Sequence, residues 1–157
     1  MVVSGDEIRR VMGRFATGVT VVTILDDDGV PQGFTVNSLT SVSLDPPLAL
    51  VCVDLSAKVF PCFRRDRVFA VNILSEAQEE VSRRFASKID DKFQGISCRP
   101  GRAGPPLIDG CIGYMECRIV HDYPGGDHTI FVGQVETTET AQDGKPLLFY
   151  GGKYAKL

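Results

Sequence analysis

The chain has 157 residues and a formal net charge of −3 at pH 7, and its lysines and arginines are spread along its length. A chain of this length is typical of one domain, residues 1–157, which buries about two-thirds of the surface that its unfolded form exposes. The sequence contains no basic stripe, which argues against nucleic acid as a partner, and no apolar run that approaches the roughly 20 residues needed to cross a bilayer.

The first predicted element is a short amphipathic helix. It begins at a capping box, since Ser4 is followed three residues later by Glu7. Apolar residues then recur at the spacing of one helical face: Ile8, Val11, Met12 and Phe15. The segment 17–55 follows with three β-branched runs, separated by the turn-forming sequences DDDG and DPP. This pattern predicts successive strands that pair in antiparallel fashion.

The middle of the chain predicts two further helical segments with a strand between them. SAKVFPCFRR is typical of a short helix, although Pro61 must lie in its first turn or interrupt it. RVFAVNIL has the composition of a buried strand. Ser75 and Gln78 then form a second cap signature. The apolar positions of the helix that follows share one face: Ala77, Val81 and Phe85.

Residues 87–109 are rich in Gly and Pro and show little periodicity, which predicts a long loop; loops of this length are usually functional or mobile. The sequences CIGYMECRIVHDY, HTIFVGQVETTET and PLLFY then predict strands joined by turns at PGGD and AQDGK. At least six strands with hairpin-length connections, and no regular alternation of strand and helix, favour an antiparallel barrel over a doubly wound sheet.

Five cysteines occur at positions 52, 62, 98, 111 and 117, and no pair has the C-x-x-C spacing of a metal knuckle or a redox dithiol. They are therefore predicted to be reduced thiols. Cys52, Cys111 and Cys117 lie in apolar strand-like runs, where a thiol behaves as a small buried hydrophobe. Reduced cysteines and the lack of an amino-terminal signal sequence together predict a cytoplasmic protein.

Several enzyme classes lack their motifs in this chain. No G-x-G-x-x-G opens a helix, and there is no Walker loop, H-E-x-x-H or G-x-S-x-G. The two histidines, His121 and His128, are seven residues apart, so a zinc site would have to recruit scattered cysteines or carboxylates, and no metal is predicted. From the residues alone, His121 is a surface strand residue and His128 is a turn or capping histidine.

Hydroxyl and amide side chains are concentrated between Gly33 and Pro47, where six of the nine residues 35–43 are Ser, Thr or Asn. A strand that faces only solvent would account for this composition. However, the stretch lies between two strongly apolar strands, so part of its polar edge should be buried, and buried polar groups need partners. A ligand with many acceptors, such as a phosphate, would provide them.

The motifs FATGVTVVT, GFTVNSLTSVSLDPP, RVFAVNIL, DKFQG, the Pro-Leu-Ile and Gly near 106–110, ECRI and GDHTIFVGQV occur in an order that resembles the flavin reductase family. The family comprises the short reductase components of two-component flavin-dependent monooxygenases. The resemblance runs from about Ile8 to Tyr154. It implies a mostly β fold, a Greek-key split β-barrel of the FMN-binding type with two or three short helices, which forms a homodimer with flavin in a groove beside the partner subunit.

The resemblance also implies which residues bind flavin. TVNS corresponds to the family's T-A-N-S along the isoalloxazine, with Val36 in place of the common Ala, and SVS continues that wall. CVDLSAK corresponds to the ring edge and phosphate segment, in which Ser56 and Lys58 would hold the phosphate; an ordinary solvated lysine is the alternative for Lys58. The full expected set is Thr35, Val36, Asn37, Ser38, Ser41, Val42, Ser43, Cys52, Val53, Asp54, Ser56 and Lys58, with Arg84, Phe85, Lys92 and Phe93 approaching flavin or nucleotide from the second helix and the loop after it.

His128 matches the histidine of the family's G-D-H turn, which implies a catalytic role as an orienting contact for the nicotinamide of NADH or NADPH. Asp127 beside it would tune its charge. The carboxyl-terminal LLFYGGKYAKL is similar to the family's closing pattern, in which Tyr154 would cover the nicotinamide pocket. The usual arginine of that pattern is replaced by Gly151 or Gly152.

The function that this resemblance implies is an NAD(P)H:flavin oxidoreductase, which reduces FMN or FAD by hydride transfer and passes the reduced flavin to a separate oxygenase. The absence of an arginine cluster for a 2′-phosphate favours NADH slightly. A flavin-binding or haem-binding split-barrel carrier or sensor is the alternative. A third reading uses the same fold for a pyridoxamine phosphate or a deazaflavin, against which the pairing of S-V-S and G-D-H argues.

Overall fold

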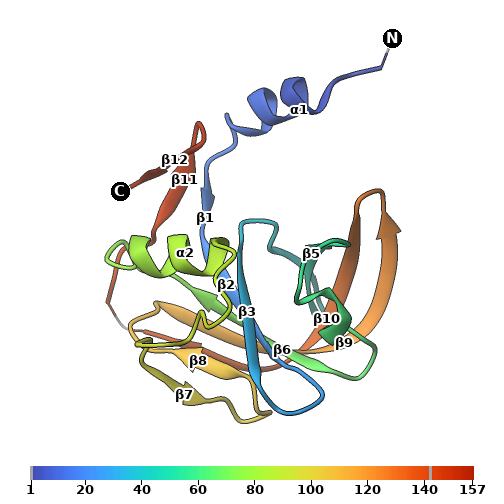
Figure 1. Cartoon of the computed structure of the whole chain (residues 1–157), viewed down its shortest axis with the longest axis vertical. Coiled ribbons are helices and arrows are strands. Elements are labelled where there is room, and N and C mark those ends of the chain that lie inside the picture. The colour runs from blue at the N-terminus through green and yellow to red at the C-terminus, as the bar shows by residue number, and fades with distance from the viewer. Residues whose placement is uncertain (1, 142) are drawn as a thin grey trace.

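The computed structural model describes residues 2–141 and 143–157, and over this part of the chain antiparallel strands dominate (Figure 1). The helical elements are α1 (Gly5–Met12), the 3₁₀ turn η1 (Phe60–Cys62) and α2 (Glu79–Ala86). The strands are β1 (Thr17–Gly18), β2 (Thr20–Leu25), β3 (Pro31–Val36), β4 (Thr40–Leu44), β5 (Pro47–Asp54), β6 (Val68–Ile73), β7 (Cys98–Pro100), β8 (Pro106–Ile108), β9 (Gly113–Gly125), β10 (His128–Thr140), β11 (Leu148–Tyr150) and β12 (Lys153–Ala155).

The main sheet has seven strands in the order β3-β2-β6-β9-β10-β5-β4, and every neighbouring pair is antiparallel. The sheet curls so that its two sides meet: Ser38, two residues after β3, accepts a hydrogen bond at 3.1 Å from the backbone N–H of Cys52 in β5. The rings of Phe34 and Phe63 also meet edge to face across this closure, with centroids 5.8 Å apart. The prediction of a mostly β split barrel is confirmed.

Apolar side chains fill the interior because alternate residues of the strands point inward. The core includes Val22, Val51, Phe69, Ile119 and Phe131, each at most 3% exposed. A second apolar cluster lies under α2, where Phe85 is fully buried. This helix therefore covers the part of the sheet formed by β2 and β3, the strand that leads into the polar stretch.

Two smaller sheets flank the main one. β1, β11 and β12 form one of them, and β7 pairs with β8 in the other. Helix α1 stands away from the body of the molecule in Figure 1, and none of its residues is buried. Its capping box is confirmed, since the Ser4 hydroxyl accepts the Glu7 N–H and the Glu7 carboxylate accepts the Ser4 N–H at 2.8 Å.

Several expected boundaries are corrected by the structure. Helix α1 ends at Met12, so Phe15, which was expected on its apolar face, lies beyond it. Helix α2 begins at Glu79, because its first backbone bond runs from the Ser82 N–H to the Gln78 carbonyl, and Ala77 lies outside the helix. The Gln78 side chain does accept the Ser75 N–H at 2.9 Å, as the cap signature predicts, although Ser75 is not the N-cap. SAKVFPCFRR contains only the single turn η1, with Pro61 inside it. The expected long loop includes the hairpin β7–β8, and β12 was not predicted. Part of the predicted AQDGK turn, Gln142, lies outside the described residues.

All five cysteines are free. Cys111 and Cys117 are buried as predicted, Cys52 is half-buried, and Cys62 is buried as well. Burial raises the pKa of Cys111 and of Cys117 to about 12. No helix in the described part of the chain is both long enough and apolar enough to cross a membrane.

Candidate functional site

The polar stretch after β3 divides into hydroxyls that bond to the protein and side chains that remain free to meet a ligand. Thr35 donates its hydroxyl to the Ser82 carbonyl of α2 at 2.6 Å, and the Ser38 hydroxyl lies within hydrogen-bonding distance of both the Cys52 N–H and the Cys52 carbonyl. The expectation that part of this edge is buried and needs partners is thus met by protein groups at Thr35 and Ser38. Asn37 and Ser41 are exposed.

Strand β4 continues this polar face as an edge strand of the main sheet. Val42 is 48% exposed and Ser43 is half-buried, so the expected S-V-S wall presents a mixed apolar and polar surface. A bulge between Ser41 and Ser43 shifts the register of β4 against β5. The bulge leaves Val42 without a paired residue on β5 at this point.

A pocket of about 200 Å³ lies between the end of β3, α2 and the β11–β12 hairpin. Its walls are mostly apolar and aromatic, with polar groups at the rim, as is common in sites for planar ring systems. The lining residues are Val19, Thr35, Val36, Asn37, Ala86, Phe149 and Tyr154. The structure therefore brings the predicted TVNS wall together with Tyr154. It adds Val19, Ala86 and Phe149, which were not among the expected site residues.

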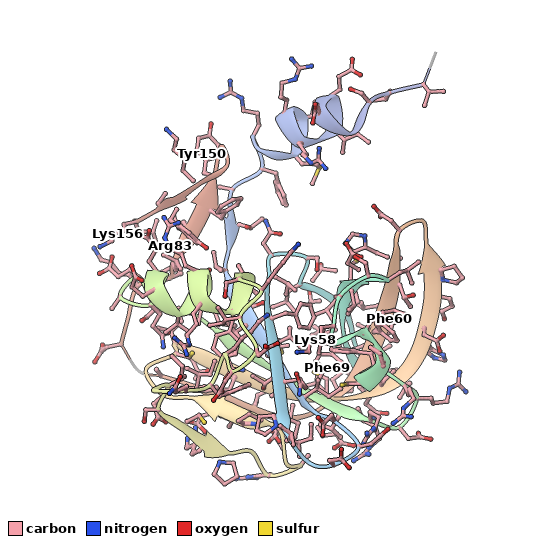
Figure 2. All side chains as sticks on the ribbon, viewed as in Figure 1. Lys58, Phe60, Phe69, Arg83, Tyr150 and Lys156 are labelled. Carbon is pink, nitrogen blue, oxygen red and sulfur yellow. The ribbon has the colours of Figure 1, made fainter. Side chains whose placement is uncertain are left out.

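Tyr154 has a fixed place in this pocket. Its hydroxyl lies 2.7 Å from the Ser82 hydroxyl, its ring meets Phe149 edge to face at 5.6 Å, and the Arg83 guanidinium lies 4.8 Å from its ring centroid. Figure 2 shows Arg83 beside the β11–β12 hairpin. Figure 1 places the β11–β12 hairpin and the β9–β10 turn on opposite sides of the molecule, so the expected nicotinamide contacts of Tyr154 and His128 do not come together within one chain.

The second group of predicted residues lies at the end of β5. Asp54 accepts hydrogen bonds from the Ser56 hydroxyl and the Ser56 N–H, both at 2.7 Å, and these bonds lower the pKa of Asp54. They close a turn that leads to Lys58, whose Nζ lies 2.8 Å from the Asp90 Oδ1 atom. The Val53 side chain is fully buried, so the expected ligand contact of Val53 is restricted to its backbone.

His128 lies next to this turn. It is the first residue of β10 and pairs with Asp54 of β5 and with Gly125 of β9. Its Nδ1 atom is 2.7 Å from the Asp127 Oδ1 atom, and its side chain is 40% exposed. The Leu55 N–H donates to the Asp127 carbonyl at 3.0 Å, which ties the G-D-H turn to the Asp54–Ser56 turn. The predicted phosphate segment and the predicted nicotinamide histidine are therefore neighbours.

The two predicted basic residues around α2, Arg84 and Lys92, bind backbone carbonyls of the helix, the following loop and β3. Arg84 donates to the Lys92 carbonyl at 2.7 Å and to the Asp91 carbonyl at 3.0 Å. Lys92 in turn donates to the Phe85 carbonyl at 2.9 Å and to the Gly33 carbonyl at 3.3 Å. Burial, and secondly the charge of Lys58, lower the pKa of Lys92. These reciprocal bonds connect α2, the loop and β3.

The expected flavin contact of Phe85 is wrong, because its side chain is fully buried and packs edge to face on Phe93 with centroids 5.0 Å apart. Phe93 is half-buried and belongs to the same apolar cluster. Both aromatic rings support α2 from below. The helical periodicity of the sequence correctly placed Phe85 on the buried face of the helix. Its expected contact with flavin came only from the resemblance to the family.

A second hollow, of about 270 Å³, lies at a different part of the sheet and contains none of the predicted residues. It is lined by Leu25, Asp66, Arg67, Val68, Ala103, Pro105 and Arg118. Its two arginines are already paired, Arg67 with Asp27 and Arg118 with Glu136. Among residues 2–141 and 143–157, no group of three or more His, Cys, Asp or Glu side chains is placed to hold a metal ion. The aromatic pocket and the β5–β10 corner are thus the candidate site.

Comparison with known proteins gives a consistent family. Residues 12–157 match the family model described as "Flavin reductase like domain". The chain is 43% identical over 148 residues to the reductase subunit HsaB of a flavin-dependent monooxygenase from Mycobacterium tuberculosis, with 93% of this chain and 79% of that protein covered. It is 41% identical over 155 residues to an NADH-dependent FAD reductase from Streptomyces globisporus, with 96% and 84% covered.

Solved structures show the same similarity. The NADH:FAD oxidoreductase SgcE6 of Streptomyces globisporus, in complex with NAD and FAD fragments, superposes with a TM-score of 0.92 at 40% identity. The alignment covers 100% of this chain and 96% of that one. The flavin reductase PheA2 superposes with a TM-score of 0.88 at 35% identity, over 99% of each chain.

Proposed function

Because the chain belongs to the flavin reductase family, we propose that it is an NAD(P)H:flavin oxidoreductase that reduces FMN or FAD and supplies the reduced flavin to a separate oxygenase. The observation that carries this proposal is the aromatic pocket formed by the TVNS wall and Tyr154. The names of the relatives, among them NADH-dependent reductases, favour NADH as the electron donor.

The residues present fit a flavin. The pocket has an aromatic and apolar lining of a kind that suits a planar ring, and Lys58 supplies a positive charge in the segment after β5. A bound flavin would accept a hydride from a reduced nicotinamide, and this transfer itself requires no acid or base from the protein. The chain's own residues then have the task of binding and orienting two ring systems in contact.

Each side of the site has a distinct role in this proposal. Thr35, Val36 and Asn37 form the wall for the flavin ring, while Lys58 and Ser56 receive its phosphate. Ser56 now donates its hydroxyl to Asp54, and Lys58 is paired with the exposed Asp90, so both groups would exchange a protein partner for the phosphate. His128 would orient the nicotinamide through the ring nitrogen that does not contact Asp127. Because the β9–β10 turn and the aromatic pocket lie on opposite sides of one chain, this nicotinamide would meet the flavin ring across the homodimer proposed below.

The activity is tested with purified protein, NADH and either FMN or FAD. We expect loss of the near-ultraviolet absorbance of NADH in the presence of flavin and, without oxygen, bleaching of the flavin's visible band. A chain that binds flavin but never bleaches it would be a carrier or sensor instead. Lack of turnover with NADH and with NADPH at saturating flavin would contradict the proposal.

We also propose that the chain functions as a homodimer in the cytoplasm, with an oxygenase as its downstream partner. The exposed apolar face of α1 supports self-association, since such a face is normally covered in a stable assembly. Five free thiols support a reducing compartment. A relative that is a monooxygenase reductase subunit supports the oxygenase partner.

A further inference from the structure

We infer that Ser82 is a positioning residue of the proposed flavin site: by binding both Thr35 and Tyr154, it fixes the distance between the two walls of the aromatic pocket. This inference rests on the proposed function, because it assumes that the pocket receives the flavin ring. Ser82 itself does not line the pocket, so its effect on the ligand is transmitted through the two residues that do.

Ser82 contacts the two walls through different atoms. Its carbonyl accepts the Thr35 hydroxyl at 2.6 Å, and its own hydroxyl lies 2.7 Å from the Tyr154 hydroxyl. The serine is fully buried, while Thr35 and Tyr154 are half-buried, so these bonds are partly shielded from water. A single residue of α2 therefore connects the end of β3 with β12, two elements that belong to different sheets.

The position of Ser82 relative to β3 is rigid. α2 approaches β3 so closely that a Cβ atom on Gly33 would come 2.8 Å from the Phe85 ring. The Lys92 ammonium also donates to the Gly33 carbonyl of β3 and to the Phe85 carbonyl of α2. The helix is attached to the strand at these points and at Thr35. The Ser82 hydroxyl is therefore held in place relative to β3, and so is the Tyr154 hydroxyl that bonds to it.

Tyr154, in contrast, lies on the outer strand of a hairpin whose backbone bonds to the body are made by β11 and by the β11–β12 turn, where the Gly151 N–H donates to the Gly13 carbonyl. β12 pairs only with β11, and β11 pairs with the two-residue strand β1. In the described part of the chain, the bond between Tyr154 and Ser82 is the hydrogen bond that joins β12 to α2. Arg83 over the ring and Phe149 at its edge hold the aromatic plane but do not fix the hydroxyl end.

Loss of this bond would leave the Tyr154 wall free to move relative to Thr35 while the rest of the pocket stays in place. A pocket of variable width binds a rigid ring less tightly, since the wall must be ordered when the ligand binds. The expected effect is therefore on flavin affinity. Once flavin is saturating, the hydride transfer should be little changed.

The test uses Ser82→Ala, Tyr154→Phe and the double variant, with Ser87→Ala as the matched control. Ser87 is the residue that caps the carboxyl end of α2, and it donates its hydroxyl to the Arg84 carbonyl at 2.6 Å without lining the pocket. Each single variant should raise the KM for flavin about fivefold, the ratio expected for one net hydrogen bond, with kcat changed less than about twofold. Because both remove the same bond, the double variant should match the singles.

The results separate the inference from the proposed function. If the wild-type protein has no flavin-dependent NADH oxidation, the proposed function fails. If the wild-type protein is active and the Ser82 and Tyr154 variants lose only thermal stability, with the KM for flavin equal to that of Ser87→Ala, the positioning role is refuted. Additive increases in the KM of the double variant would also overturn it, because the two hydroxyls would then act independently.

Discussion

The Nδ1 atom of His128 lies 2.7 Å from the Oδ1 atom of Asp127, and this contact orients the imidazole at the start of β10. A neutral histidine that donates from Nδ1 to the carboxylate keeps Nε2 as an acceptor. The same residue pairs with Asp54 in β5, so its free nitrogen lies at the corner where the Asp54–Ser56 turn and the G-D-H turn meet. An acceptor in this position is suited to the amide group of a nicotinamide.

Replacement of His128 by Ala should raise the KM for NADH roughly tenfold and change the KM for flavin far less, because about one hydrogen bond to the nicotinamide is lost. Steady-state kinetics with each substrate varied in turn measure the two constants. His121→Ala is the matched control, since His121 is exposed and stacks only on Tyr123. Equal losses for NADH and flavin would refute an orienting role for His128.

Replacement of Lys58 by Met should weaken FMN binding about five- to tenfold and leave riboflavin binding unchanged, because an ammonium interacts with the phosphate that riboflavin lacks. Quenching of flavin fluorescence gives both dissociation constants. Lys88→Met, at another exposed lysine, is the control. Asp90→Asn should have the opposite effect on FMN, since it removes the carboxylate that now lies 2.8 Å from Lys58. Equal weakening of FMN and riboflavin would place the phosphate elsewhere.

The parts of the fold that follow from local chemistry could be predicted from the sequence. The capping box at Ser4 and the buried strand at RVFAVNIL each follow from neighbouring residues, and both are confirmed. The start of α2 at Glu79 could not be predicted, because the side-chain amide of Gln78, besides its expected bond with Ser75, donates to the Asp109 carbonyl, 31 residues away. The residue at which such a helix begins depends on contacts between residues that are far apart in the sequence.

The residues of the candidate site likewise divide into those that the sequence could place and those that it could not. A family motif located the TVNS wall, and the structure places it beside the aromatic pocket. Motifs did not show that Arg84 and Lys92 fold back onto backbone carbonyls, because a long charged side chain can equally extend toward a ligand. Ser82 has no sequence signal. A serine on the inner face of a short helix can be assigned a role only when its hydrogen-bond partners are known, and here these lie in β3 and β12.

Gly33→Ala should destabilise the fold by about 1–3 kcal/mol, because the added Cβ would lie 2.8 Å from the Phe85 ring and α2 would have to move outward. Gly18→Ala is the matched control, since a Cβ there meets nothing within 4 Å, and we expect a change within about 0.5 kcal/mol. Denaturant unfolding measures both values. A Gly33→Ala protein as stable as the control would show that α2 is not tightly seated on β3.

Native-state labelling with iodoacetamide should modify the exposed Cys98 first and the half-buried Cys52 next, while Cys111 and Cys117 resist. Burial raises the pKa of the last two thiols to about 12, so they are protected both sterically and by the scarcity of thiolate. Mass spectrometry of timed samples gives the order. Rapid labelling of Cys117 in the folded protein would contradict its placement in the core.

The same two thiols predict a loss of stability in alkali. The pKa of each thiol in the folded protein lies above its ordinary value of 9.0. The stability that these protonated thiols contribute to the fold is therefore fully present below pH 9 and is lost as the pH rises from about 9 toward 12. Cys111→Ala with Cys117→Ala should flatten the decline in the free energy of unfolding over this range. An identical pH profile for the double variant would mean that other groups cause the decline.

The apolar face of α1 should be the contact that maintains a homodimer. Val11 is 71% exposed, and Ile8 and Met12 are each more than half exposed; Phe15, three residues beyond the helix, is 68% exposed. The end of the helix is fixed by the bond from the Gly151 N–H to the Gly13 carbonyl at 2.8 Å. Ile8→Ser combined with Val11→Ser removes apolar area but keeps the Ser4–Glu7 capping box. We therefore expect the helix to form and the dimer to dissociate.

Light scattering coupled to size-exclusion chromatography, over a range of protein concentrations, measures this change in mass. Arg10→Ser on the same helix is the control, because it removes an exposed charge and leaves the apolar face intact. In a dimer whose stability depends on α1, the thermal midpoint of the wild-type protein should rise with concentration, and that of the double variant should not. A wild-type chain that stays monomeric at every concentration, or a double variant that dimerises as tightly as Arg10→Ser, would show that the α1 face has another partner.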